Sequence, residues 1–175
     1  MSKGIWIISD THFGHEAFLS FRTTEGEKIR DFSSVREMDD CMIENWNATV
    51  KQGDKVYHLG DVVMRKQFLR LIPYLNGKLR LVRGNHDIFP TKAYLDAGFD
   101  EIYGVRVLEG IIMSHFPLRD DSIERFKGNV HGHVHEQDSP SPKHFNACVE
   151  RNNYTPVHFD EIKTHFETET ALRNW

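Results

Sequence analysis

The sequence has few of the features that would place the protein outside the cytoplasm or in a membrane. Its two cysteines, Cys41 and Cys148, lie far apart and form no Cys-x-x-Cys pair that could hold zinc or exchange disulfides. The N-terminal apolar run, residues 5–8, is too short for the core of a signal peptide or for a membrane span. These absences predict a cytoplasmic protein without a membrane partner.

The chain also lacks an excess of basic residues. Lys and Arg number 22 against 26 Asp and Glu, which gives a formal net charge of −4. This balance counts against a protein that binds nucleic acid in bulk, although it is compatible with a local basic patch. The length of 175 residues, without repeats or low-complexity tracts, predicts a single domain over residues 1–175 and leaves the oligomeric state open.

What the sequence does contain is a recurring unit in which a short apolar run ends in a polar cluster. Three such runs are predicted strands: residues 4–9, 55–59 and 78–82. Four later segments are also predicted strands, the first as a hairpin that turns at Glu109-Gly110: residues 105–114, 129–130, 144–149 and 157–159.

Helices are predicted between the first strands. Ser34 to Glu37 matches a capping box, and apolar residues at helical spacing follow: Val35, Met38, Met42 and Trp46. A shorter helix is predicted over residues 67–75, closed by Asn76-Gly77, with Phe68, Leu71, Ile72 and Leu75 as its inner face. This alternation of strands and helices predicts an α/β fold.

Residues that can bind metal ions follow five of the predicted strands. They are Asp10-x-His12, Gly60-Asp61, Gly84-Asn85-His86-Asp87, His115, and His131 and His133 on either side of Gly132. Because ligand sites in α/β folds assemble at the carboxyl ends of strands, we expect the five clusters to converge. Carboxylate, amide and imidazole donors without a thiolate favour Mn, Fe, Zn, Ni or Co, and their number is too large for one ion. Two ions would leave positive charge for a phosphate ester.

Each cluster alone has a simpler explanation. Asp10-x-His12 can cap a turn, residues 84–87 are typical of turns, and His131-Gly-His133 could be a surface histidine cluster. Their joint occurrence in order, each after a strand, makes coincidence remote. His58, inside an apolar strand, is interpreted as a hydrogen-bonded core residue. His135 is assigned either a substrate contact or a solvated loop position.

The ordered string Asp-x-His, Gly-Asp, Gly-Asn-His-Asp, His and Gly-His-x-His, over residues 10 to 133, resembles the calcineurin-like metallophosphoesterases. The resemblance implies a four-layer α/β/β/α sandwich and two divalent transition metal ions, with Mn expected first. One ion would be held by Asp10, His12 and His133. The other would be held by Asn85, His115 and His131. Asp61 resembles the carboxylate that bridges the two ions, and a hydroxide between them is the implied nucleophile.

The implied activity is hydrolysis of phosphodiesters or phosphomonoesters of nucleotides or other small molecules. We expect His86 to protonate the departing oxygen and Asp87 to orient His86. His15 and Arg119 are the candidate substrate contacts. The chain lacks long insertions, which makes it similar to the small, minimal bacterial-type members. The alternatives are a nuclease, which the acidic balance disfavours, and an idle binding scaffold, which the filled ligand positions disfavour.

Overall fold

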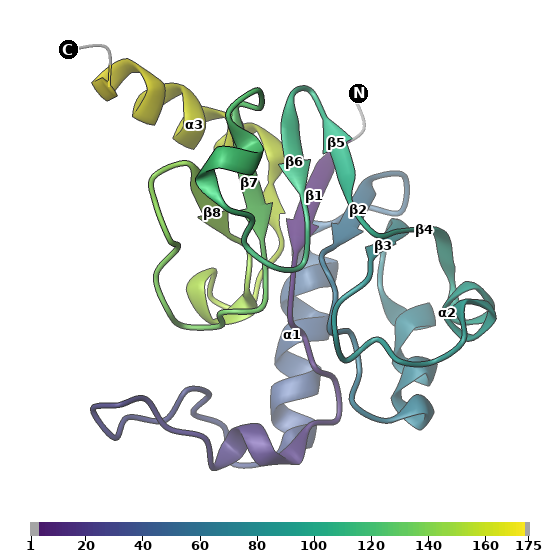
Figure 1. The fold of residues 1–175 in the computed structure, drawn as a ribbon. Coiled ribbons are helices and arrows are strands. Elements are labelled where there is room, and N and C mark those ends of the chain that lie inside the picture. Colours follow the sequence, from purple (N-terminus) through teal and green to yellow (C-terminus); the bar gives the residue numbers. More distant parts are fainter. Residues whose placement is uncertain (1–3, 174–175) are drawn as a thin grey trace.

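The computed structural model describes residues 4–173, which contain two β-sheets packed against each other (Figure 1). The larger sheet has the strand order β4-β3-β2-β1-β9 and the smaller sheet the order β5-β6-β7-β8. The larger sheet consists of β1 (Ile5–Ile8), β2 (Lys55–His58), β3 (Lys78–Val82), β4 (Phe99–Tyr103) and β9 (Val157–His158). The smaller consists of β5 (Arg106–Leu108), β6 (Ile111–Met113), β7 (Gly128–His131) and β8 (His144–Asn146). The predicted α/β class is confirmed.

Helices connect the parallel strands of the larger sheet. α1 (Val35–Thr49) lies between β1 and β2, η2 (Lys66–Tyr74) between β2 and β3, and α2 (Thr91–Ala97) between β3 and β4. α3 (Phe159–Arg173) follows β9, and the short 3₁₀ helices are η1 (Glu16–Leu19), η3 (Asp120–Ile123) and η4 (Val149–Arg151). Within residues 4–173, no helix has both the length and the apolar character needed to cross a bilayer.

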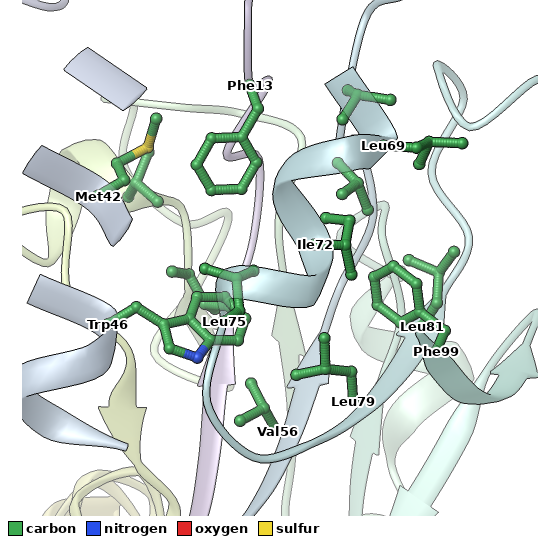
Figure 2. Close-up of a cluster of buried hydrophobic side chains, with 14 of the residues drawn as sticks. Phe13, Met42, Trp46, Val56, Leu69, Ile72, Leu75, Leu79, Leu81 and Phe99 are labelled. Carbon is green, nitrogen blue, oxygen red and sulfur yellow. The ribbon is translucent and has the colours of Figure 1, made fainter. Parts of the chain in front are cut away.

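Two buried clusters hold these layers together because successive strand residues point to opposite faces of a sheet. On the outer face of the larger sheet, Trp46 of α1 and Ile72 of η2 pack against strand side chains such as Leu79 (Figure 2). The cluster between the sheets draws on both sheets and on α3: Ile7, Tyr57, Leu59, Val82, Ile111, Met113, Val130, Ala147, Phe159, Ile162 and Phe166. The sheets are therefore fixed relative to each other by apolar side chains that both sheets and α3 contribute.

Several local predictions are confirmed in detail. The hairpin turns at Glu109 and Gly110, whose φ angles of 50° and 84° match a two-residue turn that follows the twist of its strands. Ser34 caps α1 by accepting a hydrogen bond from the Glu37 amide at 3.1 Å. The Glu37 carboxylate bonds to Ser33 instead of Ser34, so the reciprocal half of the capping box is displaced by one residue.

Other local predictions need correction. The helix expected over residues 67–75 is the 3₁₀ helix η2, which contains Pro73 and buries Leu69 and Ile72. A proline removes one backbone donor and disfavours α-helical geometry in the turn before it. The sequence analysis missed α2 and β4 altogether. β4 alternates poorly, because two acids, Asp100 and Glu101, stand exposed in its middle.

The packing predicts a large stability loss on removing Trp46. This side chain is fully buried, and its indole nitrogen donates to the Asn76 carbonyl at 2.9 Å. Trp46→Ala should therefore lower the free energy of unfolding by about 3–5 kcal/mol, as for other buried tryptophans. Urea unfolding measures the change, with Tyr74→Ala as an exposed aromatic control that should shift it by less than about 0.5 kcal/mol. A loss below about 1 kcal/mol for Trp46→Ala would contradict this packing.

Candidate metal centre

The polar loops of the larger sheet meet at one edge because β1, β2 and β3 are parallel. Backbone hydrogen bonds join the first two loops, from the Asp10 amide to the Gly60 carbonyl at 3.0 Å and from the His12 amide to the Asp61 carbonyl at 3.0 Å. The third loop joins them through the His86 amide, which donates to Asp61 Oδ1 at 2.8 Å. Three loops are thus held in one register by their own backbone.

The smaller sheet brings its histidines to the same place. The Gly132 amide donates to the His115 carbonyl at 2.9 Å, and the His133 amide donates to Asp10 Oδ2 at 2.9 Å. Gly132 has no room for a side chain, since a Cβ there would lie 2.2 Å from Asp10 Oδ2. The loop after β7 therefore docks directly onto the loop after β1.

Two groups of donor atoms result from this docking. Asp10, His12 and His135 present ligand atoms within 4.8 Å of one another, and so do Asp10, Asp61 and His115. Asp61 Oδ2 lies 3.5 Å from His12 Nε2 and 3.5 Å from His115 Nε2. Asp10 thus belongs to both groups, and Asp61 Oδ2 lies equally far from one imidazole of each, a position that a carboxylate shared by two ions would take.

Several of these donor atoms are buried without a hydrogen-bond partner. Within residues 4–173 they include Asp10 Oδ1 and both ring nitrogens of His12. A buried polar atom left unpaired costs about 1–3 kcal/mol, and such atoms are rare in folded proteins. A divalent cation would satisfy an anionic oxygen and imidazole lone pairs together, so the donor set fits a metal ion.

His115 and Asn85 point to the same requirement. The Leu59 carbonyl lies 2.8 Å from His115 Nδ1 and accepts its proton, so the neutral ring has an unshared electron pair at Nε2. That nitrogen faces Asn85 Oδ1 at 2.8 Å. Two acceptors at this separation need a cation or a second proton beside them.

The backbone at the centre is strained. Of the eight non-glycine residues with positive φ in the described chain, five belong to this centre: Asp10, His12, Asp61, His133 and His135. The left-handed conformation costs a residue with a Cβ roughly 1–2 kcal/mol, and such strain gathers at functional sites. The left-handed backbone therefore lowers the stability of the fold, and in return it directs these side chains into the centre.

The placement of the three alternating histidines differs from the sequence-based expectation. His135, and not His133, joins Asp10 and His12, while the His133 ring lies 5.1 Å from the His115 ring. The His131 ring faces away, with Nδ1 at 2.8 Å from the Gly132 carbonyl and Nε2 at 3.0 Å from Ser139 Oγ. The expected pair of histidines is therefore displaced two residues towards the C-terminus.

Two residues that the sequence analysis did not assign hold His135 in place. Glu150 Oε1 accepts from His135 Nδ1 at 3.1 Å, which leaves Nε2 facing Asp10 Oδ1 at 3.8 Å. Arg30, fully buried, pairs with the same Glu150 oxygen at 2.7 Å and donates to the Asp10 and Thr11 carbonyls. A carboxylate behind a ligand histidine fixes its tautomer and orientation.

Burial keeps the His12 imidazole available as a neutral donor. Burial lowers the pKa of His12 to about 4 and raises the pKa of Asp61 to about 6. Burial alone would raise the pKa of Asp10 too, but the surrounding imidazoles, His12 foremost, hold that pKa below its usual range. The centre thus combines an ionised Asp10 carboxylate with a neutral His12 imidazole, whereas the Glu150 carboxylate raises the pKa of His135 against the effect of burial.

The two expected catalytic residues, His86 and Asp87, lie in different surroundings. His86 is exposed, and its ring lies 5.6 Å from the His12 ring. Asp87 does not contact the His86 ring among the described contacts; its carboxylate accepts from the amides of Asp61, Val62 and Gly84 at 2.8, 3.1 and 2.8 Å. The Asp87 carboxylate therefore organises the Asp61 loop, and the role of orienting the His86 ring stays a prediction without a described contact behind it.

The two expected substrate contacts, His15 and Arg119, also differ in their distance from the centre. The His15 ring lies 5.6 Å from the His12 ring, and its Nδ1 has no partner among the described residues. Arg119 pairs with Asp121 at 2.9 Å, is largely exposed, and makes no described contact with the centre. His58 is the core residue expected, because its ring accepts from the Gly60 amide and bonds to Thr11 Oγ1.

The chain is similar in sequence to known proteins. The chain is 32% identical to an uncharacterized protein, MJ1445, of Methanocaldococcus jannaschii, over 98% of this chain and 96% of that one. It is 29% identical to the Gene 66 protein of Mycobacterium phage L5, over 47% of this chain and 39% of that one.

Solved structures are similar as well. A protein of unknown function from Aquifex aeolicus, AQ665, matches with a TM-score of 0.73 and 29% identity, over 93% of this chain and 99% of that one. A nuclease of Pseudomonas putida, MPE, matches with a TM-score of 0.49 and 18% identity, over 75% of this chain and 61% of that one. The model of the calcineurin-like phosphoesterases matches residues 4–169. The chain therefore belongs to the calcineurin-like phosphoesterase family.

Proposed function

We propose that the protein hydrolyses phosphate esters with two divalent transition metal ions. The first ion would be held by Asp10, His12 and His135. The second would be held by Asn85, His115 and His133. Asp61 would be shared between them. His131 has no place in this set, because both of its ring nitrogens are engaged elsewhere.

The buried unpaired donors carry this proposal. Asp10 Oδ1 and His12 Nε2 lie 3.7 Å apart, and neither has a hydrogen-bond partner in residues 4–173. When bound, a pair of divalent ions supplies Lewis acidity that draws charge from a phosphate and lowers the pKa of water. Mn²⁺ is the ion we would test first, followed by Fe, Zn, Ni and Co, because the donors mix oxygen and nitrogen.

His86 is the residue of this chain that would donate a proton to the leaving group. Its backbone amide is fixed to Asp61 Oδ1, whereas its ring is exposed in front of the His12 ring. A ring in this position can give a proton to the departing oxygen without also serving as a ligand. The His15 ring, whose centre lies 5.6 Å from that of the His12 ring, would contact the substrate.

Metal removal provides the first test. Taking away both ions leaves the Asp10 and Asp61 carboxylates facing each other, so chelation should abolish hydrolysis of bis(4-nitrophenyl) phosphate. It should also lower the melting temperature by roughly 5–10 °C, from about 2.7 kcal/mol of linkage at a hundredfold excess over Kd. Mn²⁺ should restore both quantities. Full hydrolysis after metal removal, verified by elemental analysis, would refute the proposal.

A second prediction concerns His86→Ala. Metal content and folding should stay close to wild type, while kcat on an alkyl phosphate ester falls by ~10²–10⁴, the range of general acid catalysis. The loss should be much smaller on a nitrophenyl ester, whose leaving group departs without a proton. Ile88→Ala, an exposed change in the same loop, serves as the control. Equal losses on the two esters would reject proton donation by His86.

A third prediction concerns Glu150→Gln, which keeps the shape of the side chain but removes the charge behind His135. Mn²⁺ affinity should fall by about 10- to 100-fold, as for other partners of ligand histidines. Calorimetric titration measures the affinity, and thermal melting verifies that the variant is folded. The control is Asp138→Asn, an exposed acid that pairs with Arg151. Equal Mn²⁺ affinity in the two variants would show that Glu150 does not position His135.

A further inference from the structure

The chain's basic residues are distributed very unevenly. Residues 62–86 contain six of the 22 Lys and Arg and none of the 26 Asp and Glu. The rest of the chain therefore carries 16 basic residues against 26 acidic ones. A net charge of −4 hides a strongly basic segment, and such asymmetry along a chain suggests a polyanionic partner.

Three of these six cations are either paired with acceptors or lie far from the metal centre. Arg80 pairs with Glu101 at 2.9 Å, and Arg83 donates to the Asp87 and Phe89 carbonyls. Lys78 begins β3, at the end of the strand opposite the metal centre. The other three cations lie on or next to η2, and we name them the η2 ridge: Arg65, Lys66 and Arg70.

The ridge is exposed and has no acidic partner. None of its three side chains is paired with a carboxylate in the part of the chain that the structure describes. Arg70 lies 5.7 Å from the Phe68 ring, a contact that leaves its charge uncompensated. Three free cations within six residues form the kind of local field that attracts a chain of phosphates.

Two cavities adjoin the ridge, one at Arg65 and the other at Lys66 and Arg70. The first, about 550 Å³, is lined by Arg65, Met64 and the segment that carries His15. The second, about 500 Å³, lies between η2 and α2, and its lining includes Lys66, Arg70 and Pro90. The ridge therefore borders two hollows that adjoin the loops after β1 and β3.

Acidic side chains in the two cavities offset little of the positive charge of the ridge. Glu16 lines the first cavity, and Asp96 lines the second, where it already pairs with Lys92 at 2.7 Å. Two exposed rings border the same region: Phe21 is 42% exposed beside the His15 ring, and Tyr74 is 69% exposed at the end of η2. Cations together with exposed aromatic rings are the elements that bind unpaired nucleic-acid strands.

We propose that the η2 ridge binds the sugar–phosphate backbone of a single-stranded nucleic acid and presents one of its phosphodiester bonds to the metal centre. The inference rests on the proposed function and names its substrate class. Five residues of 3₁₀ helix span roughly 10 Å, which is long enough for the ridge to contact more than one phosphate of an extended strand. A mononucleotide has no second backbone phosphodiester to make such a contact.

Binding of a fluorescein-labelled dT20 strand, followed by anisotropy with the purified full chain and no added metal, tests the ridge. The triple variant Arg65→Ala, Lys66→Ala, Arg70→Ala should bind at least about tenfold more weakly. The slope of log affinity against log salt should also become shallower by about 2, since each phosphate contact contributes roughly −0.7.

The matched control removes three exposed cations at or near the opposite end of the strands, Lys51, Lys55 and Lys78, by the same change to Ala. It should bind dT20 within about twofold of wild type. Equal losses in both triple variants would show a net-charge effect and overturn the proposal, as would wild-type binding by the ridge variant. Tighter binding of a hairpin duplex than of dT20 would overturn the single-strand assignment.

Hydrolysis of bis(4-nitrophenyl) phosphate by the Mn²⁺-loaded wild type separates this inference from the function on which it rests. This small diester carries one phosphate and does not need the ridge. Absence of its hydrolysis would refute the catalytic proposal, whereas the dT20 comparison decides the ridge by itself. Release of shorter products from dT20 by the wild type, reduced at least tenfold in the ridge variant, is the expected joint result.

Discussion

The close approach of Gly132 to Asp10 is the constraint on which the metal centre depends. It joins the two sheets at their polar edge, because the loop after β7 can reach the loop after β1 only where no side chain intervenes. The His133 amide then completes the contact by donating to Asp10 Oδ2. With one Asp10 oxygen engaged by the protein, the other is left to face His12 and His135. A single glycine thus allows the two loops to meet and leaves one carboxylate oxygen of Asp10 directed towards the imidazoles.

Much of the fold could be predicted because strands, loops and helices alternate and the sequence marks the boundaries between them clearly. The ordered polar clusters also predicted the convergence, since carboxyl ends of parallel strands must meet. The periodicity of the strand could not decide which two of the three alternating histidines face the centre. A step of two residues preserves strand spacing, so His131, His133 and His135 are equivalent by periodicity.

Two signals could have resolved the histidines. Gly132-His133-Val134-His135 reads Gly-His-x-His as it stands, whereas the expectation began the motif one histidine earlier. The second signal is structural: His133 and His135 adopt left-handed backbone, and His131 does not. The partnership of Arg30 with Glu150 was beyond any local pattern, because 120 residues separate them. Only the fold brings such a pair together, and the sequence analysis had left the segment around Arg30 without a role.

The buried position of Arg30 has a consequence for motion. Arg30 belongs to the segment between η1 and α1, residues 20–34, which contains no long helix or strand of the kind that would fix its position by itself. Here its one fully buried cation is bonded to Glu150 and to two backbone carbonyls of the loop that carries Asp10. Withdrawing Arg30 would strand a charged carboxylate in the interior, at a cost of about 3–5 kcal/mol. The backbone around Arg30 can therefore leave the Asp10 loop only by local unfolding, which makes it a fixed part of the surroundings of the metal centre.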